Sequence, residues 1–292
     1  MKIAVMTDSN SGITQFEGKE IGITVVPMPF FIDGNEFLED ITLTQEEFYN
    51  KLLGDANVST SQPSVGYISA TWDDLLKEND YIIYIPMSSG LSKSCETATK
   101  LSESPNYKDK VFVINNQRIS VTQRESVMAA LKMIELGYDV NKIVDSLMDY
   151  KMNSDIFIMV DTLTYLKKGG RITATAAALG GFLKLKPILL IKGEKLDSFR
   201  MRNRTLENAK NIMIEAVKKI RSGYMYEIDN NLDNIEVSVA YSGTDRTNAD
   251  LFKEEIEKEL GLKVTYVNPL SLSVSCHIGP GALAIAITKK II

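Results

Sequence analysis

The chain has 292 residues, of which 44% are hydrophobic and 24% are charged, and its formal net charge at pH 7 is −5. This balance is typical of a soluble globular protein and excludes a disordered, collagenous or fibrous chain. The net negative charge argues against nucleic acid as a partner. One histidine and two cysteines exclude a multi-histidine zinc site and a disulfide framework. The length corresponds to two ordinary domains or one large one.

No segment of the sequence predicts export or membrane insertion. The apolar run that opens the chain stops at Asp8, which makes it too short for a signal peptide. No other run approaches the roughly 18–20 apolar residues that a membrane-spanning helix needs. We therefore expect a cytoplasmic protein without stable membrane insertion.

Strand and helix patterns alternate along the first half of the chain. Short apolar runs bounded by turn residues predict strands at 2–7, 23–28, 29–32, 81–85 and 111–115. Helical patterns with start and stop signals predict helices at 44–53, 64–77, 92–101, 121–136 and 140–152. Thr44 and Glu47 form a capping box at the start of the first of these helices, and Ser64 is a candidate cap for the second.

The second half shows the same alternation. The pattern predicts strands at 155–160, 236–240, 263–267 and 282–288, helices at 162–167, 205–221 and 249–260, and a hairpin of 187–191 with 195–199. Strands that alternate with helices require crossover connections, which favours an α/β fold with largely parallel or mixed sheets. Two such sets, divided near residue 155, predict two α/β domains at residues 1–155 and 156–292.

Polar loops follow several of the predicted strands, at the sheet edge where open α/β sheets bind their ligands. These loops span residues 7–12, 86–92 and 161–171, and residues 59–64 form a further one. Their Ser and Thr residues lie at or near helix starts, where backbone N–H groups and the helix dipole favour an anion. Ser, Thr and Asp are also ordinary N-caps, so capping alone would explain any single loop. Several such loops together favour a shared polar site.

Two further residues are candidates for that site. Arg171 follows a Gly-Gly pair and could pair with a carboxylate or phosphate, or be a solvated loop residue. His277 is the only histidine, and it could donate to an anion, act as a base or be a satisfied core residue. A serine nucleophile, Ser89 or Ser92, with His277 as its base is conceivable, but the sequence names no acid to orient the histidine.

Three arginines alternate with other residues after the predicted hairpin, namely Arg200, Arg202 and Arg204. On an extended segment their side chains would point to one side. They predict either a docking patch for an acidic partner or a sheet edge that charge keeps solvated.

Seven sets of residues, in order along nearly the whole chain, resemble the DegV family. They are residues 7–9, 60–64, 88–92, 165–172 and 186–189, the pair Arg202 and Arg204, and residues 277–282. The sequence departs from the family pattern at residues 10–12, where Asn-Ser-Gly replaces the usual Thr-x-Asp, and at Ala284, where glycine is common. It also has fewer lysines after Arg200 than many relatives have.

The resemblance implies a fatty-acid-binding protein. Family members bind one long-chain fatty acid, with its carboxylate at the interface between two α/β domains and its tail in an apolar tunnel. Some are the lipid-carrying subunit of a bacterial fatty acid kinase, in which a separate ATP-dependent chain converts the bound carboxylate to an acyl phosphate for phospholipid synthesis. By this resemblance the chain is a carrier and not itself an enzyme, and it needs no metal or other cofactor. Its partners are the fatty acid and the kinase subunit.

The loop residues and the resemblance together assign three groups of residues. The predicted carboxylate-binding residues are Thr60, Ser61, Ser89, Ser92, Arg171 and His277. The predicted tail-lining residues, each of which could equally be a plain core residue, are Phe30, Leu163, Ile172, Ala176, Leu179, Phe182, Leu183 and Ile188. The predicted partner-docking residues are Arg200, Arg202 and Arg204. Two other functions stay open: a serine hydrolase or acyltransferase that uses Ser89 or Ser92 with His277, and a subunit of a dihydroxyacetone-kinase-like phosphotransferase.

Overall fold

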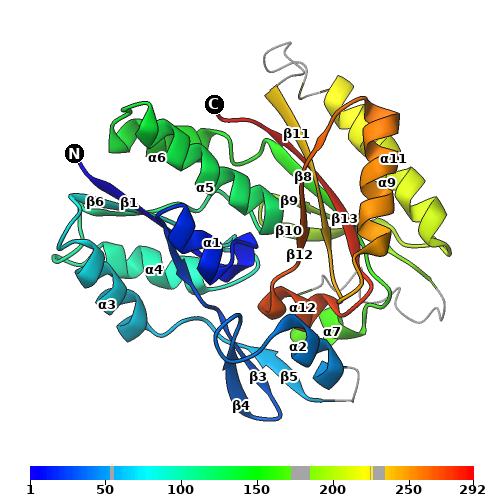
Figure 1. Ribbon diagram of the computed structural model, residues 1–292, viewed down its shortest axis with the longest axis horizontal. Coiled ribbons are helices and arrows are strands. Elements are labelled where there is room, and N and C mark those ends of the chain that lie inside the picture. Colours follow the sequence, from blue (N-terminus) through cyan, green and yellow to red (C-terminus); the bar gives the residue numbers. More distant parts are fainter. Residues whose placement is uncertain (53–55, 172–184, 224, 226–233) are drawn as a thin grey trace.

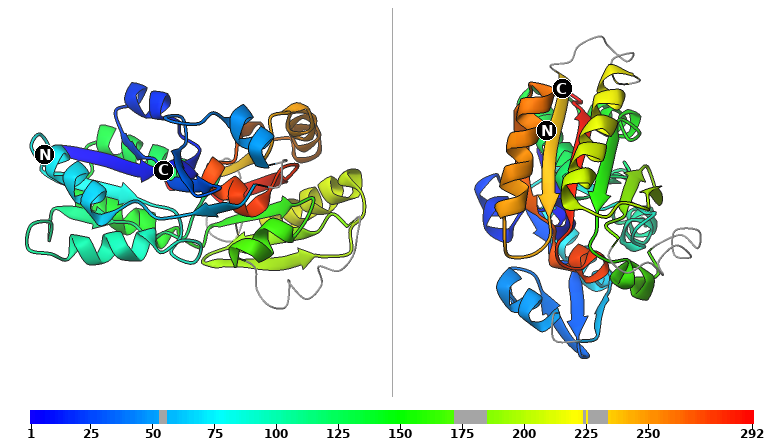
Figure 2. Two further views of the ribbon diagram at one scale, coloured as in Figure 1. Left: turned by 90° about the horizontal axis from the view of Figure 1, so that it is seen from below. Right: turned by 90° about the vertical axis from the view of Figure 1, so that its right-hand side faces the viewer.

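Three β-sheets organise the molecule, which Figure 1 shows in one view and Figure 2 from two further sides. The computed structural model describes residues 1–52, 56–171, 185–223, 225 and 234–292. The sheets have four, six and three strands, and helices from both halves of the chain pack against the two larger ones.

The first sheet is parallel and belongs to the N-terminal half of the chain. Its strands are β1 (Ile3–Asp8), β2 (Thr24–Val26), β6 (Tyr81–Ile85) and β7 (Val111–Val113), in the spatial order β2-β1-β6-β7. The helices of this half are α1 (Gln15–Glu20), α3 (Val65–Leu75), α4 (Ser94–Ser102), α5 (Ser120–Glu135) and α6 (Val140–Asp149). Ile83 packs with residues of α5 and α6, and its neighbour Ile82 packs with residues of α3 and α4. Successive strand residues face opposite sides, so helices cover both faces.

The second sheet is mixed. Its strands are β8 (Ser154–Met159), β9 (Ile188–Lys192), β10 (Lys195–Arg200), β11 (Ile235–Tyr241), β12 (Val264–Pro269) and β13 (Leu283–Lys289), in the spatial order β10-β9-β8-β13-β11-β12. Strands β11 and β12 run parallel, and the other four neighbouring pairs are antiparallel. The predicted α/β fold with parallel and mixed sheets is confirmed. This second sheet is mixed because β9 and β10 form the predicted hairpin, and because β13 runs back between β8 and β11.

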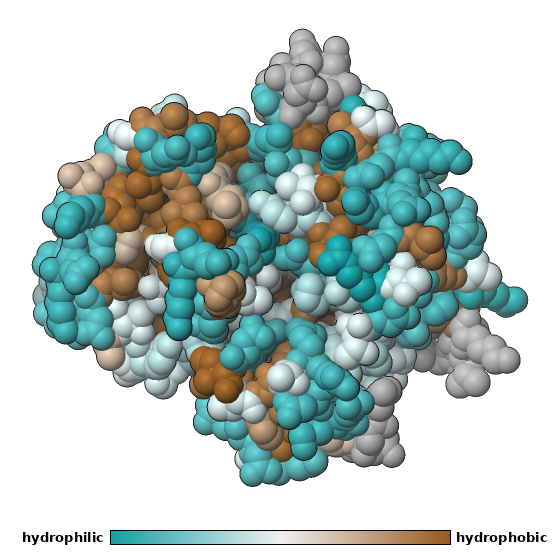
Figure 3. All heavy atoms as spheres, viewed as in Figure 1, coloured by the Kyte–Doolittle hydropathy of each residue, from teal (hydrophilic) through white to brown (hydrophobic). Residues whose placement is uncertain are grey.

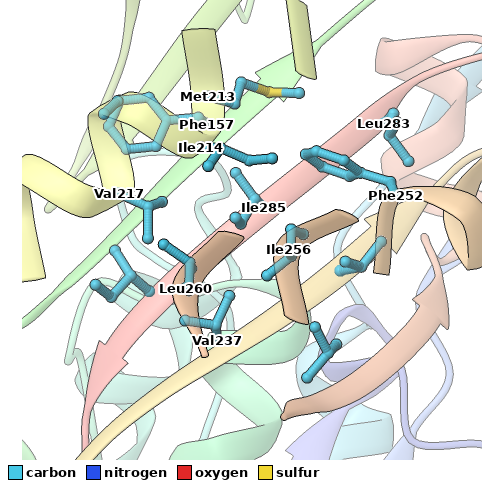
Figure 4. Close-up of a cluster of buried hydrophobic side chains, with 14 of the residues drawn as sticks. Phe157, Met213, Ile214, Val217, Val237, Phe252, Ile256, Leu260, Leu283 and Ile285 are labelled. Carbon is cyan, nitrogen blue, oxygen red and sulfur yellow. The ribbon is translucent and has the colours of Figure 1, made fainter. Parts of the chain in front are cut away.

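One face of the second sheet is covered by two helices that lie side by side, α9 (Leu206–Ser222) and α11 (Thr247–Leu260). Figure 4 shows the apolar cluster between them and the sheet, with Phe157 on β8 and Phe252 on α11. A second cluster joins residues of this sheet, such as Ile158, to Met28 and Met87 from the first half of the chain. The loops that follow β2 and β6 therefore lie against the second sheet.

The third sheet is small and antiparallel, and it lies at the bottom of the view in Figure 1. Its strands are β3 (Pro29–Ile32), β4 (Asn35–Leu38) and β5 (Val58–Thr60), in the order β4-β3-β5. Helix α2 (Gln45–Leu52) accompanies it, and the predicted capping box at its start is confirmed: the Thr44 N–H donates to Glu47 Oε2 at 2.9 Å, and the Glu47 N–H donates to Thr44 Oγ1 at 3.3 Å.

Two short helices of the second half connect to this small sheet, namely α7 (Thr164–Gly169) and α12 (Leu272–Ile278). Phe30 on β3 contacts Phe48 on α2 edge to face, with 5.6 Å between the ring centroids, and both belong to a buried cluster with Leu272 and Cys276 of α12. Strands β4 and β5 and helix α12 are not among the predicted elements, although α12 carries His277.

The two-domain division stays a prediction. Strand β8 starts at Ser154, so the predicted boundary after residue 155 falls inside this strand.

Across the described ranges, no helix combines the length and the apolar character that a bilayer span requires. The face in Figure 3 is largely hydrophilic, with hydrophobic side chains gathered over the side where α5 and α6 lie in Figure 1.

Candidate functional site

A cavity of about 310 Å³ lies where the carboxyl edge of the first sheet meets α12 and the third sheet. This is the edge at which open α/β sheets bind ligands, and typical ligand pockets hold about 300–1,000 Å³. The lining residues are Asn10, Met28, Thr60, Ser61, Gln62, Met87, Leu91, Ser92, Lys93, Thr97, Arg171, Ser273, Val274 and His277.

Asp8, at the end of β1, holds together the two loops that leave the first sheet at this edge. Its carboxylate accepts hydrogen bonds from the backbone N–H of Met87 at 2.9 Å, from that of Asn10 at 3.1 Å and from Nε2 of Gln123 at 3.1 Å. Asp8 is fully buried, and this burial raises the pKa of its carboxyl. Because buried polar groups must be paired, the four residues fix the positions of Asn10 and Met87 in the cavity wall.

Asn10 links the first sheet to α12. Its Oδ1 accepts hydrogen bonds from the hydroxyls of Ser271, at 2.9 Å, and of Ser273. Ser271 is also the N-cap of α12, with its Oγ 3.4 Å from the N–H of Val274. The short helix is thus capped and tied to the loop after β1, which fixes the direction in which it carries His277.

His277 lies in the cavity wall with its ring between β5 and α7. Its Nε2 is 2.9 Å from Oγ1 of Thr60. A Cβ atom at Gly169 would lie 2.0 Å from Nδ1, so only glycine lets α7 pack against the ring. Burial, together with the smaller effect of the nearby Arg171 guanidinium, lowers the pKa of His277 to about 4. The ring is therefore neutral at pH 7, and it can donate through one nitrogen only.

Positive charge is supplied to the cavity by Arg171 and Lys93, both of which have exposed side chains. Arg171 follows α7, whose C-cap residue Gly170 is in the left-handed conformation with φ of 66°. The Arg171 guanidinium donates to the carbonyl oxygen of Gly169. Among the described residues that line the cavity, none is acidic. This balance of charge suits an anionic group.

Ser92 and its neighbours form the wall beside α4. The Ser92 hydroxyl donates to Ser94 Oγ at 3.1 Å and accepts from the Ser94 N–H at 3.2 Å. Across from it, Thr97 Oγ1 donates to Oε1 of Gln62 at 3.1 Å. His277 pairs with Thr60, and no hydrogen bond joins it to Ser89 or Ser92 in the described structure. The geometry therefore does not favour the serine hydrolase hypothesis.

Comparison with known proteins agrees with the resemblance in the sequence. Residues 2–290 match the family model described as "Uncharacterised protein, DegV family". The chain belongs to the DegV family. A DegV domain-containing protein of Staphylococcus aureus strain N315 is 30% identical, over 98% of this chain and 96% of its own.

Solved structures of other DegV proteins share the fold over the whole chain. A DegV family protein from Thermus thermophilus, described by its fatty acid binding, is 26% identical with a TM-score of 0.87, covering 99% of this chain and 100% of its own. A protein from Eubacterium ventriosum, described as binding stearic acid, is 25% identical with a TM-score of 0.87, covering 99% of each chain. These matches confirm the fold.

Five of the six predicted carboxylate-binding residues line the cavity of this DegV protein, namely Thr60, Ser61, Ser92, Arg171 and His277. Ser89 does not line it, because its hydroxyl donates to Oε1 of Glu194 at 2.9 Å and accepts from Asn115 at 2.8 Å. The structure thus brings most of the predicted set together. Their binding of a carboxylate stays a prediction.

The predicted tail-lining residues divide into two groups. Phe30, Leu163 and Ile188 are buried in three different apolar clusters, and none of the three lines the cavity. The other predicted residues lie outside the described residues; they are Ile172, Ala176, Leu179, Phe182 and Leu183. The apolar lining that the structure does describe consists of Met28, Met87, Leu91 and Val274.

The arginine segment has the alternation that the sequence predicts. Arg200, Arg202 and Arg204 are exposed, while Met201 between them is half-buried and Asn203 is buried. Asn203 explains the alternation, because its side-chain amide donates to the carbonyl oxygen of Lys186 at 3.1 Å. This bond holds the Asn203 side chain toward the protein, so the neighbouring arginines face outward. The role of the arginines in docking stays a prediction.

Several lining residues were not predicted. Asn10, Met87 and Leu91 lie in loops that the sequence analysis does single out. These loops follow β1 and β6 at the ligand-binding edge of the sheet, and this position is a signal from which the three residues could have been predicted. Ser273 and Val274 lie on α12, a helix that the sequence pattern does not predict. In the described ranges, no group of three or more His, Cys, Asp or Glu side chains could hold a metal ion.

Proposed function

We propose that this chain binds one long-chain fatty acid in the cavity. The observation that carries the proposal is a neutral His277 paired with Thr60, beside Arg171 and Lys93, in a lining whose described residues include no acid. One wall of the same cavity is apolar. Two solved relatives with this fold are described as binding fatty acid or stearic acid. A polar, cationic end beside an apolar wall matches an amphipathic carboxylic acid.

The carboxylate binds at the end of the cavity formed by Thr60, Ser61, Ser92, Arg171 and His277. If the neutral ring of His277 carries its proton on Nε2, it donates to Thr60, and the hydroxyl proton of Thr60 is left for the carboxylate. Arg171 supplies the opposite charge. Each hydrogen bond to a charged group contributes about 1.5–3 kcal/mol.

The acyl tail lies along Met28, Met87, Leu91 and Val274. Burial contributes about 0.8 kcal/mol for each CH₂ group that leaves water. The two methionines are unbranched and flexible, so this wall can adapt to chains of different shape. The apolar wall is continuous with the cluster between the two larger sheets, which keeps water from the tail.

The bound acid is presented to a separate ATP-dependent kinase subunit, which transfers a phosphoryl group to the carboxylate. The product is an acyl phosphate for phospholipid synthesis in the cytoplasm. The exposed Arg200, Arg202 and Arg204 support this part of the proposal, because three cations on one side of an extended segment suit an acidic partner surface. In this proposal the chain is a carrier, and the partner performs the chemistry.

Mass spectrometry of the lipid extracted from purified protein tests the binding proposal. We expect one fatty acid per chain, and uptake of added oleate after the lipid has been removed. Protein that contains no fatty acid and takes up no oleate would contradict the proposal. The carrier role has its own test: with ATP alone the oleate complex should form no acyl phosphate, and a fatty acid kinase subunit should enable its formation.

A further inference from the structure

A buried carboxyl group lies where the third sheet meets α12. Glu39 follows β4 and is 7% exposed, and its Oε1 accepts a hydrogen bond from Nε2 of Gln45, in α2, at 3.0 Å. The same Nε2 donates to the carbonyl oxygen of Leu270 at 3.3 Å, two residues before the start of α12. Gln45 therefore connects Glu39 to the segment that leads into α12.

Each partner of this pair has a second oxygen that is buried. Within the described part of the chain, neither Oε1 of Gln45 nor Oε2 of Glu39 forms a hydrogen bond of ordinary geometry, although the N–H of Leu272 also faces the Glu39 carboxyl. An ionised carboxylate can only accept hydrogen bonds, so it would leave the Gln45 oxygen unpaired. A protonated carboxyl carries an O–H. It can donate to the Gln45 oxygen while it accepts from Nε2, which closes a ring of two hydrogen bonds.

The charged and titratable neighbours of Glu39 in the described structure supply no positive charge. They are Asp40 beside it, Tyr49 on α2 and Cys276 on α12. Burial and the Asp40 carboxylate raise the pKa of Glu39 to about 8, although the N–H of Leu272 acts in the opposite direction. Burial also raises the pKa of Tyr49 above its ordinary value and that of Cys276 to about 12, so both neighbours are neutral at the pH at which Glu39 titrates.

Helix α12 connects this pair to the cavity. It packs beside α2 and the third sheet (Figure 1), where the Tyr49 hydroxyl donates to Oγ of Ser275 at 2.8 Å. Glu39 itself does not line the cavity. The residues of α12 that do so are Ser273, Val274 and His277. A change at Glu39 therefore reaches the cavity wall through the position of α12.

We propose that Glu39 is a positioning residue that carries a proton in the folded chain and donates it to Oε1 of Gln45, and that this acid–amide pair holds α12 in the position that fatty acid binding requires. The inference rests on the proposed binding of a fatty acid and deepens it. When the proton leaves Glu39, a buried negative charge faces the Gln45 oxygen and one of the two hydrogen bonds is lost. The affinity for fatty acid then falls in alkaline solution.

Titration of delipidated protein with oleate at pH 7 and pH 9 tests the inference. If binding requires the protonated form, the wild-type affinity should fall about tenfold, since about a tenth of the Glu39 groups keep the proton at pH 9. Glu39→Gln replaces the O–H by an N–H that cannot ionise, so it should bind oleate like the wild type at pH 7 and keep that affinity at pH 9. Glu36→Gln, at an exposed glutamate of β4, is the matched control and should follow the wild-type profile.

Urea unfolding of the same chains measures the pair without a ligand. The folded wild-type chain keeps a Glu39 proton that the unfolded chain loses above about pH 4.5, so its stability should fall relative to that of Glu39→Gln as the pH rises from about 4.5 to 8. Above this range the difference between the two chains should be constant.

The inference is wrong if this difference in stability does not change between pH 4.5 and 8. It is also wrong if the wild-type chain binds oleate equally well at pH 7 and pH 9, or if Glu39→Gln loses affinity as steeply as the wild type. A wild-type chain that binds no oleate at any pH would instead contradict the proposed function, and the unfolding measurements would still decide whether Glu39 holds the proton.

Discussion

The hydroxyl of Ser89 donates a hydrogen bond to Oε1 of Glu194 at 2.9 Å. Ser89 lies in the loop after β6, and Glu194 lies in the turn between β9 and β10, so this bond joins the first sheet to the second. The next residue, Gly90, packs directly on the same turn, since a Cβ there would lie 2.1 Å from the carbonyl oxygen of Glu194. The hairpin thus supports the loop that carries Ser92 into the cavity wall.

Gly90→Ala should destabilise the protein, because the new methyl group overlaps the backbone of Glu194. Overpacking of this kind costs about 1–3 kcal/mol, whereas Ser89→Ala removes a hydrogen bond worth about 0.5–1.5 kcal/mol. Urea unfolding of the delipidated variants measures both effects. Gly66→Ala is the matched control, because a Cβ at Gly66 in α3 meets no atom within 4 Å. A Gly90→Ala chain as stable as the wild type would contradict the contact.

Gly169→Ala should weaken fatty acid binding. The added methyl group would lie 2.0 Å from Nδ1 of His277, so the ring must move and its contact with Thr60 is lost. We expect a loss of affinity of about tenfold or more, which corresponds to about 1.4 kcal/mol or more. Titration of the delipidated variant with oleate measures it, with Gly66→Ala again as the control. An unchanged affinity for oleate would contradict the proposal that the position of the His277 ring matters for fatty acid binding.

The contribution of His277 to the stability of the delipidated protein should fall in mildly acidic solution. Burial and Arg171 lower the pKa of His277 from 6.5 to about 4, so between these pH values the unfolded chain binds a proton that the folded chain does not. The stabilisation by the neutral ring is complete above about pH 6.5 and is lost as the pH falls to about 4. The loss should be on the order of 2–3 kcal/mol.

Unfolding at a series of pH values checks this expectation in comparison with His277→Gln, which has no group that titrates at this position. The difference in stability between the two chains should change between about pH 6.5 and 4 and stay constant above that range. A constant difference across the whole series would contradict a buried, neutral His277.

Reversal of the charge at the exposed arginines should slow the phosphorylation of the bound fatty acid by the kinase subunit and should leave fatty acid binding unchanged. With Arg202→Glu and Arg204→Glu together, we expect slower acyl phosphate formation in the presence of a kinase subunit, because a charged patch acts mainly on the rate of encounter. Salt should reduce the difference from the wild type by screening the charges. Lys108→Glu, at another exposed cation, is the control. Normal coupling with loss of the lipid would place the arginines at the binding site instead.

Local signals were sufficient to predict most of the larger elements, and long-range contacts explain what was missed. The capping box at Thr44 is readable from four residues, and the bonds that it predicts are present. Helix α12 is seven residues long, and its apolar and polar residues alternate as they would in a strand. It is helical because Ser271 caps it and because Leu272 and Cys276 pack against the third sheet. The packing of Leu272 and Cys276 on the third sheet cannot be read from the segment alone.

The same limit applies to the site. Ser89 and Ser92 lie in one serine-rich loop and look equivalent in the sequence. Glu194, which is 105 residues away in the chain, pairs with Ser89, and Ser92 lines the cavity. Phe30 is predicted to contact the tail, but it packs against Phe48 of α2, beside the third sheet, and does not line the cavity. Composition and motifs therefore located the loops, while the second sheet and the third sheet decide which side chains face the cavity.

Native mass spectrometry of delipidated protein titrated with oleate tests the central claim most directly. The wild-type chain should bind one oleate. Thr60→Val and Arg171→Gln should each weaken binding by about 10- to 100-fold, because each removes a hydrogen bond to the carboxylate. Ser89→Ala, whose hydroxyl lies outside the cavity, should bind nearly as well as the wild type. No uptake by the wild-type chain, or a loss in Ser89→Ala as large as that in Thr60→Val, would contradict this account.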